Sequence, residues 1–328
     1  MIKKILVIQT ASIGDVILAT PVVEKLHAAF PEASLDLLVK KGLEELFTGH
    51  PYLHETLTWD KRSKSLMNFD QLMHRVWFTK YDLVVNLQRF LLTGLMTAFS
   101  RAGIKIGFDK NPVSFLFTRR FPHIIRENVH EIERNLSLVE SLTVPGLVRP
   151  ALYPSKTDFQ MVSLFKAVPY YTISPASLWF TKQYPAERWA ELIIKMPADC
   201  PVYLLGSPAD HDLCERISEL SGSKNIRNLS GQFTLLESAA LMKEARMNFT
   251  NDSAPMHLAS AVNAPVTAVY CSTIPGFGFG PLSDDSAVVE IQEKLDCRPC
   301  GLHGLNSCPK GHFNCAKKIP DNILLKRC

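Results

Sequence analysis

A carboxylate stands at the turn between the first predicted strand and the first predicted helix. Residues 3–9 are predicted to form a buried strand, and Thr10-Ala11-Ser12-Ile13-Gly14-Asp15 leads from it into an apolar helix. The turn itself requires Gly14 and has no need of an acid. Ligands of open α/β sheets bind beyond the carboxyl ends of the strands, so we expect Asp15 to serve chemistry rather than folding.

A second candidate lies in the stretch FTNDSAPMHLASA. Asn251 and Asp252 end a predicted strand, Asp252 or Ser253 caps the helix that follows, and Pro255 occupies its first turn. The amino end of a helix offers free N–H groups and a partial positive charge, which suit a phosphate. Any helix can also begin with such a cap and an early proline, so the structural interpretation stays open beside the functional one.

Two more loops could hold parts of a nucleotide. Lys182 follows the small-residue loop Ser174-Pro175-Ala176-Ser177 and can reach a diphosphate, while Asp210 follows Gly206 at a place where an acid can hold a ribose hydroxyl. The structural alternatives are a solvated surface lysine and a helix cap. Together with the Asp252 loop, the loops of Lys182 and Asp210 predict a nucleotide-diphosphate site. The sequence has neither G-x-G-x-x-G nor a Walker loop, the signatures of dinucleotide-dependent hydride transfer and of P-loop hydrolysis.

Alternating strands and helices must position these loops. That alternation predicts a doubly wound parallel sheet, and the pattern restarts after the linker-like segment TVPGLVRPALYPSK at 143–156. We therefore predict an α/β protein with two Rossmann-like domains facing a cleft, residues 1–150 and 151–328. The predicted strands are 3–9, 34–39, 55–59, 82–87, 105–107, 171–174, 202–205, 247–250 and 266–270; the predicted helices are 15–29, 44–47, 93–100, 185–195, 210–219, 235–244 and 253–262.

Composition excludes several classes of protein. The chain has 328 residues, of which 46% are hydrophobic and 21% charged, as in ordinary globular proteins. No apolar run approaches the roughly 20 residues of a membrane span, and Ile5–Ile8 is too short for a signal peptide, which predicts a cytoplasmic protein. The net charge of +4 lies wholly in residues 1–150 and is too small for a nucleic-acid binder. It suits an anionic substrate or an anionic membrane face.

Four of the eight cysteines cluster near the end of the chain. Cys297, Cys300, Cys308 and Cys315 follow the pattern C-x₂-C-x₇-C-x₆-C, with His303 and His312 inside it. The first pair has the spacing of zinc ligands, whereas the second is wider than in a zinc ribbon. We predict structural thiols or an oxidation-sensitive clasp, with a metal site as the alternative.

Five motifs in order give the chain a resemblance to a known family. They are Thr10-Ala11-Ser12-Ile13-Gly14-Asp15-Val16, His130-Glu131-Ile132-Glu133-Arg134-Asn135, Ser174-Pro175 with Thr181-Lys182-Gln183-Tyr184-Pro185, Leu205-Gly206-Ser207-Pro208, and Asn251-Asp252-Ser253-Ala254-Pro255-Met256-His257. On these motifs the sequence resembles, nearly end to end, the ADP-heptose:lipopolysaccharide heptosyltransferases of glycosyltransferase family 9. It departs at Ala254, where glycine is usual, and at Tyr184, where tryptophan is usual.

The resemblance implies a GT-B architecture and a metal-independent, inverting transfer without a cofactor. It implies that Asp15 takes the proton from the acceptor hydroxyl. Lys182 and the helix beginning near Ser253 would stabilise the departing ADP, Asp252 would bind the donor sugar and Asp210 the ribose. The other donor-side candidates are Ser174, Thr181, Gly206, Ala254 and His257, and the acceptor-side candidates are Ser12, Gly14, Gln88, Arg89 and Arg120.

The implied partners are ADP-heptose or a related nucleotide sugar and a lipid-linked anionic saccharide, such as Kdo-lipid A. The cations of Lys61-Arg62-Ser63-Lys64 and Arg119-Arg120 suit that acceptor, or else form a solvated basic face. A lipid acceptor implies peripheral contact with the inner face of the cytoplasmic membrane. Two alternatives stay open: a transferase of the same fold for another sugar or acceptor, and a non-catalytic nucleotide- or metal-binding module.

Overall fold

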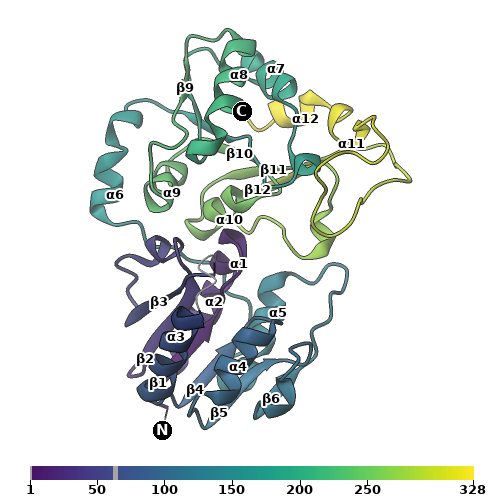
Figure 1. Cartoon of the computed structure of the whole chain (residues 1–328). Helices are drawn as coiled ribbons and strands as arrows, with labels where there is room; N and C mark the ends of the chain where they lie inside the picture. Colours follow the sequence, from purple (N-terminus) through teal and green to yellow (C-terminus); the bar gives the residue numbers. More distant parts are fainter. Residues whose placement is uncertain (1, 62–65) are drawn as a thin grey trace. The chain divides into compact units, whose positions relative to one another are not determined.

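Two parallel sheets organise the chain (Figure 1). The computed structural model describes residues 2–61 and 66–328. The chain divides into one unit of residues 1–153 and a second of residues 154–328. The division follows Tyr153, close to the predicted boundary after residue 150, and lies within the proline-rich segment, of which residues 143–155 hold no helix or strand.

The first unit contains a six-stranded sheet in the order β3-β2-β1-β4-β5-β6, with every neighbouring pair parallel. Its central strands β1 and β4 are almost wholly buried. Strands buried on both faces have continuous apolar sequences, and this made β1 and β4 easy to predict. The strands are β1 (Lys4–Ile8), β2 (Ser34–Lys40), β3 (Glu55–Trp59), β4 (Leu83–Asn86), β5 (Ile104–Phe108) and β6 (Arg119–Phe121). The helices are α1 (Ile13–Ile17), α2 (Thr20–Ala29), α3 (Leu66–Thr79), α4 (Leu91–Phe99) and α5 (Glu131–Ser137), with 3-10 turns η1 (Glu44–Phe47), η2 (Ser114–Leu116) and η3 (Glu140–Leu142).

The predicted helix 15–29 is two helices. α1 ends at Ile17, and α2 begins at Thr20 with Pro21 in its first turn. Proline has no N–H to donate, so it fits the start of a helix and not its interior. The Thr20 hydroxyl donates to the Ile17 carbonyl at 2.7 Å across the break.

The second unit repeats the design, with strand order β12-β11-β10-β7-β8-β9 and all neighbours parallel. The strands are β7 (Tyr171–Ser174), β8 (Val202–Leu204), β9 (Ile226–Asn228), β10 (Met247–Asn251), β11 (Val266–Tyr270) and β12 (Ser286–Glu290). The helices are α6 (Lys156–Met161), α7 (Ala186–Lys195), α8 (His211–Ser221), α9 (Leu235–Lys243), α10 (Ala254–Ala261), α11 (Asn314–Lys317) and α12 (Asp321–Leu325), with 3-10 turns η4 (Ser163–Phe165), η5 (Phe180–Lys182), η6 (Pro208–Asp210) and η7 (Pro275–Phe277). The α/β class with two Rossmann-like units is therefore confirmed.

Several elements escaped prediction. Three edge strands (β6, β9 and β12) carry exposed residues, so they lack the apolar runs that reveal central strands. Helices α3 and α5 were also not predicted. In α5, Ile132 and Leu136 face the core together with Arg134 and Asn135, and this mixture hides the helical period.

The C-terminal segment packs onto the core of the second unit. Phe313, Cys315, Ala316 and Leu324 are buried with the α7 side chain of Trp189 and its neighbours. Asp321 accepts from Lys195 Nζ at 2.9 Å and pairs with Arg188 of α7. No helix among residues 2–61 and 66–328 combines the length and the apolar character that crossing a bilayer requires.

Candidate functional site

Asp15 lies in the first turn of α1, beyond the carboxyl end of β1. Its Oδ2 accepts hydrogen bonds from the Ser12 N–H at 3.1 Å and from the Ser12 hydroxyl at 2.5 Å. An acid at this position of a capping box stabilises the start of a helix, so the expectation that the turn has no use for an acid is wrong. No hydrogen bond to Oδ1 is found within the described chain, which leaves that oxygen available to a ligand.

Helix α5 adds an ion pair beside this turn. Arg134 Nε donates to Glu131 Oε2 at 2.9 Å, and both side chains are largely buried. Burial raises the pKa of Glu131, the Arg134 charge opposes this shift, and the nearby Asp15 charge adds to it. Asn135 Nδ2 donates to the Leu18 carbonyl at 3.3 Å and ties α5 to the end of α1. The motif His130–Asn135 therefore reaches the Asp15 turn, which the sequence analysis did not predict.

The loops around β1 and β4 are tied together by amide side chains. Gln88 Nε2 donates to Gln9 Oε1, which also accepts from the Ala11 N–H at 3.3 Å. Lys61 Nζ donates to the Thr10 carbonyl at 2.7 Å, and burial lowers the pKa of that lysine. Gln88 and Lys61 thus brace the strand that leads into the Asp15 turn.

The remaining acceptor-side candidates are spread over the first unit. Ser12 and Gly14 belong to the α1 turn, and Arg89 is exposed directly after β4. Its charge acts on both Glu131 and His123, so it lies within electrostatic reach of the α5 ion pair. Arg120 is exposed on edge strand β6, and no contact joins it to Asp15 among the described residues. Arg62 and Lys64 lie outside the described residues.

In the second unit, Lys182 and Asp252 form an ion pair at the carboxyl ends of β7 and β10. Lys182 Nζ lies 2.6 Å from Asp252 Oδ2, with the two side chains 15% and 7% exposed. The Thr273 hydroxyl donates to the same Oδ2 at 2.6 Å. Lys182 is therefore no freely solvated surface lysine: its ammonium is held at the edge where a ligand of this fold binds.

Hydrogen bonds between loops fix the positions of these two residues. Asn251 Oδ1 accepts from the Tyr184 N–H at 2.9 Å, and Asn251 Nδ2 donates to the Pro175 carbonyl at 2.6 Å. The Thr181 Oγ1 accepts from the Ser272 hydroxyl at 2.9 Å and from the Leu305 N–H at 2.8 Å. Thr181 is thus a buried structural tie rather than an exposed donor contact. Ser174, at the end of β7, is likewise buried.

Helix α10 begins directly after Asp252 and Ser253, as predicted. The Ser253 side chain makes no capping bond to the helix, and its hydroxyl instead donates to the Asn251 carbonyl at 3.5 Å. Pro255 has no N–H, and the Met256 N–H donates to the Ser253 carbonyl at 3.1 Å, so among the described residues of this helix start the N–H groups left for an anion are those of Ser253 and Ala254. Ala254 occupies its first position, and His257 is buried one turn further on, beside the ring of Phe279.

Asp210 caps its own loop. Its Oδ2 accepts from the Ser207 N–H and from the Ser207 hydroxyl, both at 2.7 Å. The geometry matches that of Ser12 and Asp15 and fits the helix-cap alternative. Gly206 is required here, because a Cβ at that position would stand 2.9 Å from the Asp210 Cβ.

The cysteine cluster consists of free thiols. Cys297 Sγ lies 3.9 Å from His312 Nε2, and the Cys300 thiol donates to the Cys297 carbonyl at 3.1 Å. Burial raises the pKa of Cys315 to about 11, with the other three cysteines adding to the shift, so the metal-free thiol is neutral near pH 7. Within the described chain, these sulfurs form no group of three His, Cys or acidic ligand atoms within 4.8 Å of one another.

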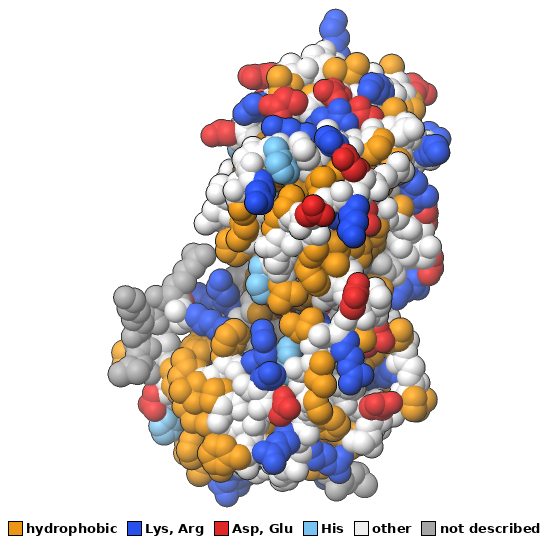
Figure 2. All heavy atoms as spheres, turned by 90° about the vertical axis from the view of Figure 1, so that its right-hand side faces the viewer, with side chains coloured by type: hydrophobic (Ala, Val, Ile, Leu, Met, Phe, Trp, Pro, Cys, Tyr) orange, Lys and Arg blue, Asp and Glu red, His pale blue; other side chains and the backbone are white. Residues whose placement is uncertain are grey.

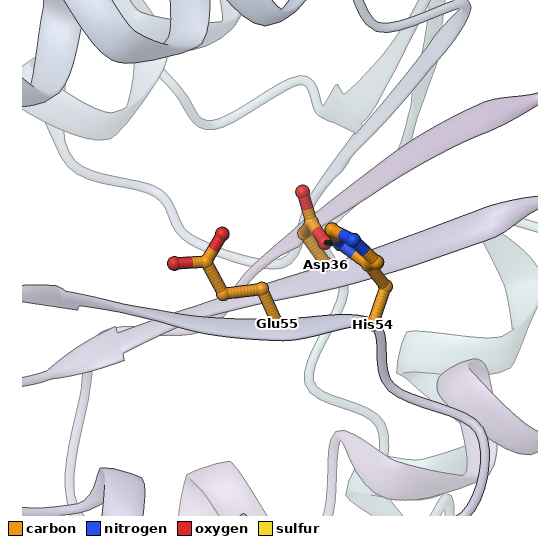
Figure 3. A group of neighbouring side chains, drawn as sticks. All are labelled: Asp36, His54 and Glu55. Carbon is orange, nitrogen blue, oxygen red and sulfur yellow. Dashed lines mark hydrogen bonds and ion pairs between the residues drawn. The ribbon is translucent and has the colours of Figure 1, made fainter.

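One group does meet that distance, and it lies in the first unit (Figure 3). Asp36 Oδ1 is 3.0 Å from His54 Nδ1, and Asp36 Oδ2 accepts from the Tyr81 hydroxyl at 2.6 Å. Glu55 pairs with Arg75. Each carboxylate already has a protein partner, so we interpret the group as a structural tie between β2, β3 and α3.

The family model of glycosyltransferase family 9 (heptosyltransferase) matches residues 70–302. The chain belongs to glycosyltransferase family 9. The matched part of this family 9 protein covers the α5 ion pair, Lys182 and Asp252, while the Asp15 turn precedes it.

Individual relatives extend the match. The family 9 protein is 26% identical over 275 residues to lipopolysaccharide heptosyltransferase 3 of Escherichia coli, covering 79% of this chain and 81% of that protein. It is 26% identical over 317 residues to lipopolysaccharide heptosyltransferase 1 of Pseudomonas aeruginosa, covering 90% and 86%.

Solved structures show the same fold. Escherichia coli ADP-heptose lipopolysaccharide heptosyltransferase II superposes with a TM-score of 0.79 at 22% identity, over 99% of this chain and 97% of that one. A family 9 glycosyltransferase of Veillonella parvula gives 0.85 at 21% identity, over 99% and 96%. Escherichia coli heptosyltransferase WaaC, solved with ADP, gives 0.73 at 20% identity, over 98% of each chain. The predicted GT-B fold class is confirmed.

Three residues beside the candidate sites were not predicted from the sequence to take part in them. Glu131 and Arg134 stood in a motif that carried the resemblance, but their chemistry was not assigned. Thr273 follows β11 in a loop with no motif, and only the pairing of β10 with β11 brings it to Asp252.

Proposed function

We propose that this glycosyltransferase moves heptose from ADP-heptose to the inner core of a lipopolysaccharide acceptor, with inversion at the anomeric carbon. The acceptor hydroxyl oxygen forms the new bond to the anomeric carbon, the bond from that carbon to the ADP β-phosphate oxygen breaks, and the hydroxyl proton passes to a base. The lipopolysaccharide heptosyltransferases among the relatives support this choice of sugar and acceptor.

Asp15 is the proposed base. Its Oδ2 is fixed by Ser12, and its Oδ1 is left for the acceptor hydroxyl. A carboxylate is a weak base in water, so it works best where binding of substrate excludes water. The buried Glu131–Arg134 pair and Arg89 supply the charges around it.

The donor site is proposed on one observation, the Lys182–Asp252 ion pair beside the start of α10. An ammonium and free helix N–H groups stabilise the negative charge that develops on the departing ADP. Asp252, with its second oxygen, can accept from a sugar hydroxyl. Asp210 Oδ2 already accepts two hydrogen bonds from Ser207. A ribose hydroxyl would therefore have to replace one of these bonds or bind beside them.

We further propose that no metal or other cofactor takes part. Lys182 and the α10 N–H groups do at the diphosphate what a divalent cation does in other transferases. The proposed place of action is the cytoplasmic face of the inner membrane, where a soluble nucleotide sugar can meet a lipid acceptor.

Mass spectrometry of a reaction with ADP-heptose and Kdo-lipid A tests the proposal. We expect the acceptor to gain one heptose and ADP to be released, and the new linkage to have the opposite anomeric configuration by NMR. ADP should raise the thermal unfolding midpoint more than UDP does. Preference for UDP would point to the alternative transferase, and nucleotide binding without transfer to any lipid acceptor would favour a binding module.

A further inference from the structure

Helix α4 of the first unit has its large apolar side chains on the outside. Leu91, Leu92 and Phe99 are exposed, and Leu95 is half-buried between them. Positions 92, 95 and 99 share one face of a helix, since they are three and four residues apart. The inner face instead carries the small or polar residues Thr93, Gly94, Thr97 and Ala98, together with Met96.

Contacts on the inner face of α4 explain why its inner residues are small or polar. The Thr97 hydroxyl accepts from Asn86 Nδ2 at 2.9 Å, and a Cβ on Gly94 would stand 2.0 Å from Asn111 Oδ1. The loop after β5 therefore leaves no room for a side chain at position 94, position 97 pairs with the polar Asn86, and Met96 is the one large apolar side chain that α4 places in the core. An ordinary surface helix has the opposite arrangement, so the outer face of α4 is unexplained by folding.

Neighbouring elements extend this apolar surface. α4 packs against both α3 and η2, and Figure 2, which views the first unit from the side on which α4 and β6 lie, shows hydrophobic side chains gathered in broad patches with Lys and Arg between them. We call this surface the α4 face. Its exposed large hydrophobic residues are Trp77, Phe78, Phe90, Leu91, Leu92, Phe99, Phe115 and Leu116.

The charge of the same region is predominantly positive. Residues 75–126 contain nine Lys and Arg but only two Asp and Glu. Arg101 lies 5.7 Å from the centroid of the Trp77 ring, so a cation and an aromatic ring are presented together. Lys80, Arg101 and Lys110 are exposed.

We propose that the α4 face is the surface by which this protein binds an anionic lipid membrane. Exposed Trp, Phe and Leu can enter the headgroup region of a bilayer, while the surrounding cations meet anionic lipid headgroups. A protein partner or a second copy of this chain would need an acidic surface to match these cations. The proposal deepens the proposed function, on which it rests, by naming the surface that meets the lipid acceptor's membrane.

The location of α4 supports the assignment. The helix begins with Phe90 and Leu91, directly after Gln88 and Arg89 at the carboxyl end of β4. This is the sheet edge that carries the Asp15 turn, because β4 pairs with β1 in parallel. A membrane contacting the α4 face therefore lies next to the edge where we place the acceptor.

Vesicle co-sedimentation of the full chain tests the α4 face. The probes are neutral phosphatidylcholine vesicles and vesicles with about one third phosphatidylglycerol, at low and high salt. We expect binding to the anionic vesicles only, weakening as salt rises. One variant replaces Phe78, Leu91 and Phe115 with Gln, and a second replaces Lys80, Arg101 and Lys110 with Gln. Since one cation near an anionic surface is worth roughly fivefold in partitioning, the second variant should lose about 100-fold.

Matched controls lie on the second unit. Leu164, Ile194 and Leu220 are exposed apolar residues, and Lys224, Lys310 and Lys326 are exposed cations; their Gln variants should bind vesicles like the wild type. Unfolding midpoints and ADP binding should stay unchanged in all four variants, which separates failure of the α4 face from failure of the proposed function. Equal loss in the controls, equal binding to neutral vesicles, or a concentration-dependent dimer abolished by the apolar variant without any lipid binding would each overturn the proposal.

Discussion

Asp252 holds Lys182 in place: Lys182 Nζ lies 2.6 Å from Asp252 Oδ2, which also accepts the Thr273 hydroxyl. The two side chains come from loops after different strands, β7 and β10, which pair in parallel. The carboxylate neutralises the ammonium as long as no other anion is present. If a diphosphate draws Lys182 away, Asp252 Oδ2 keeps the Thr273 hydroxyl, and the second oxygen of Asp252 is the one we propose for a sugar hydroxyl.

Lys182→Gln should lower both ADP affinity and stability. Removing the ammonium leaves the largely buried Asp252 with Thr273 as its only side-chain donor among the described residues, and breaking such a pair costs about 3 kcal/mol of unfolding free energy. The double variant with Asp252→Asn should recover much of that stability, because neither charge is then left alone. ADP affinity should stay low in the double variant. Denaturant titration and calorimetry measure the two quantities, and normal ADP affinity in Lys182→Gln would remove that residue from the donor site.

Asp15→Asn should keep ADP binding and reduce turnover by about 10²–10⁴-fold, the usual worth of general-base catalysis. The asparagine oxygen can still accept from Ser12, so the start of α1 should persist. Asp158→Asn is the matched control, because Asp158 Oδ2 accepts from the N–H and hydroxyl of Ser155 in the same way, at 2.6 and 2.7 Å. A similar loss of turnover in both variants would mean that the cap and not the base had been removed.

Activity should survive EDTA, because Lys182 and the start of α10 act where a divalent cation would. Transfer that is lost with EDTA and restored by Mg²⁺ or Mn²⁺ would contradict this. Thermal unfolding in EDTA is to be followed in parallel. A lowered midpoint together with stoichiometric metal in the untreated protein would show that Cys297, Cys300, Cys308 and Cys315 hold a structural ion.

Stability should fall as pH decreases from about 6.5 to about 4. Burial lowers the pKa of His123 to about 4, and the charges of Arg89 and Arg134 contribute. Between these pH values the unfolded chain binds a proton that native His123 does not, so the free energy of unfolding falls by up to about 1.4 kcal/mol per pH unit. Burial also lowers the pKa of His50 to about 4, so His123→Gln should remove only the His123 share of the slope, about half of what the two histidines contribute. His303→Gln, at an exposed position, should leave it unchanged; an equal slope in His123→Gln would refute the assignment.

Gly206→Ala should destabilise the second unit by about 1–3 kcal/mol, as overpacking does. The added Cβ would stand 2.9 Å from the Asp210 Cβ and displace the loop after β8. Gly280→Ala is the control, since nothing lies within 4 Å of a Cβ there. Calorimetric unfolding of both variants decides the matter. If ADP affinity also falls in Gly206→Ala alone, the loop contributes to the nucleotide site.

The sequence by itself determined the α/β class, the central strands and the loops that follow them. Apolar runs such as those of β1 and β4 report burial on both faces of a sheet, which is a local property of the chain. The start of α10 was equally legible, because Pro255 lies in the first turn of its own helix. Edge strands such as β6 escaped, since their residues are exposed and only pairing with β5 makes them strands.

Tertiary structure alone decided which polar residues are partners. Asp15 and Asp210 are local exceptions: they were interpreted as ligand-binding acids, yet each accepts bonds from a serine three residues earlier, in a capping pattern that belongs to the sequence itself. The partners of Lys182 and Asp252 come from different strands, and parallel pairing sets those distances. The small residue on the inner face of α4 at Gly94 likewise follows from the close approach of Asn111, which lies in the loop after β5 and is distant from Gly94 in the sequence.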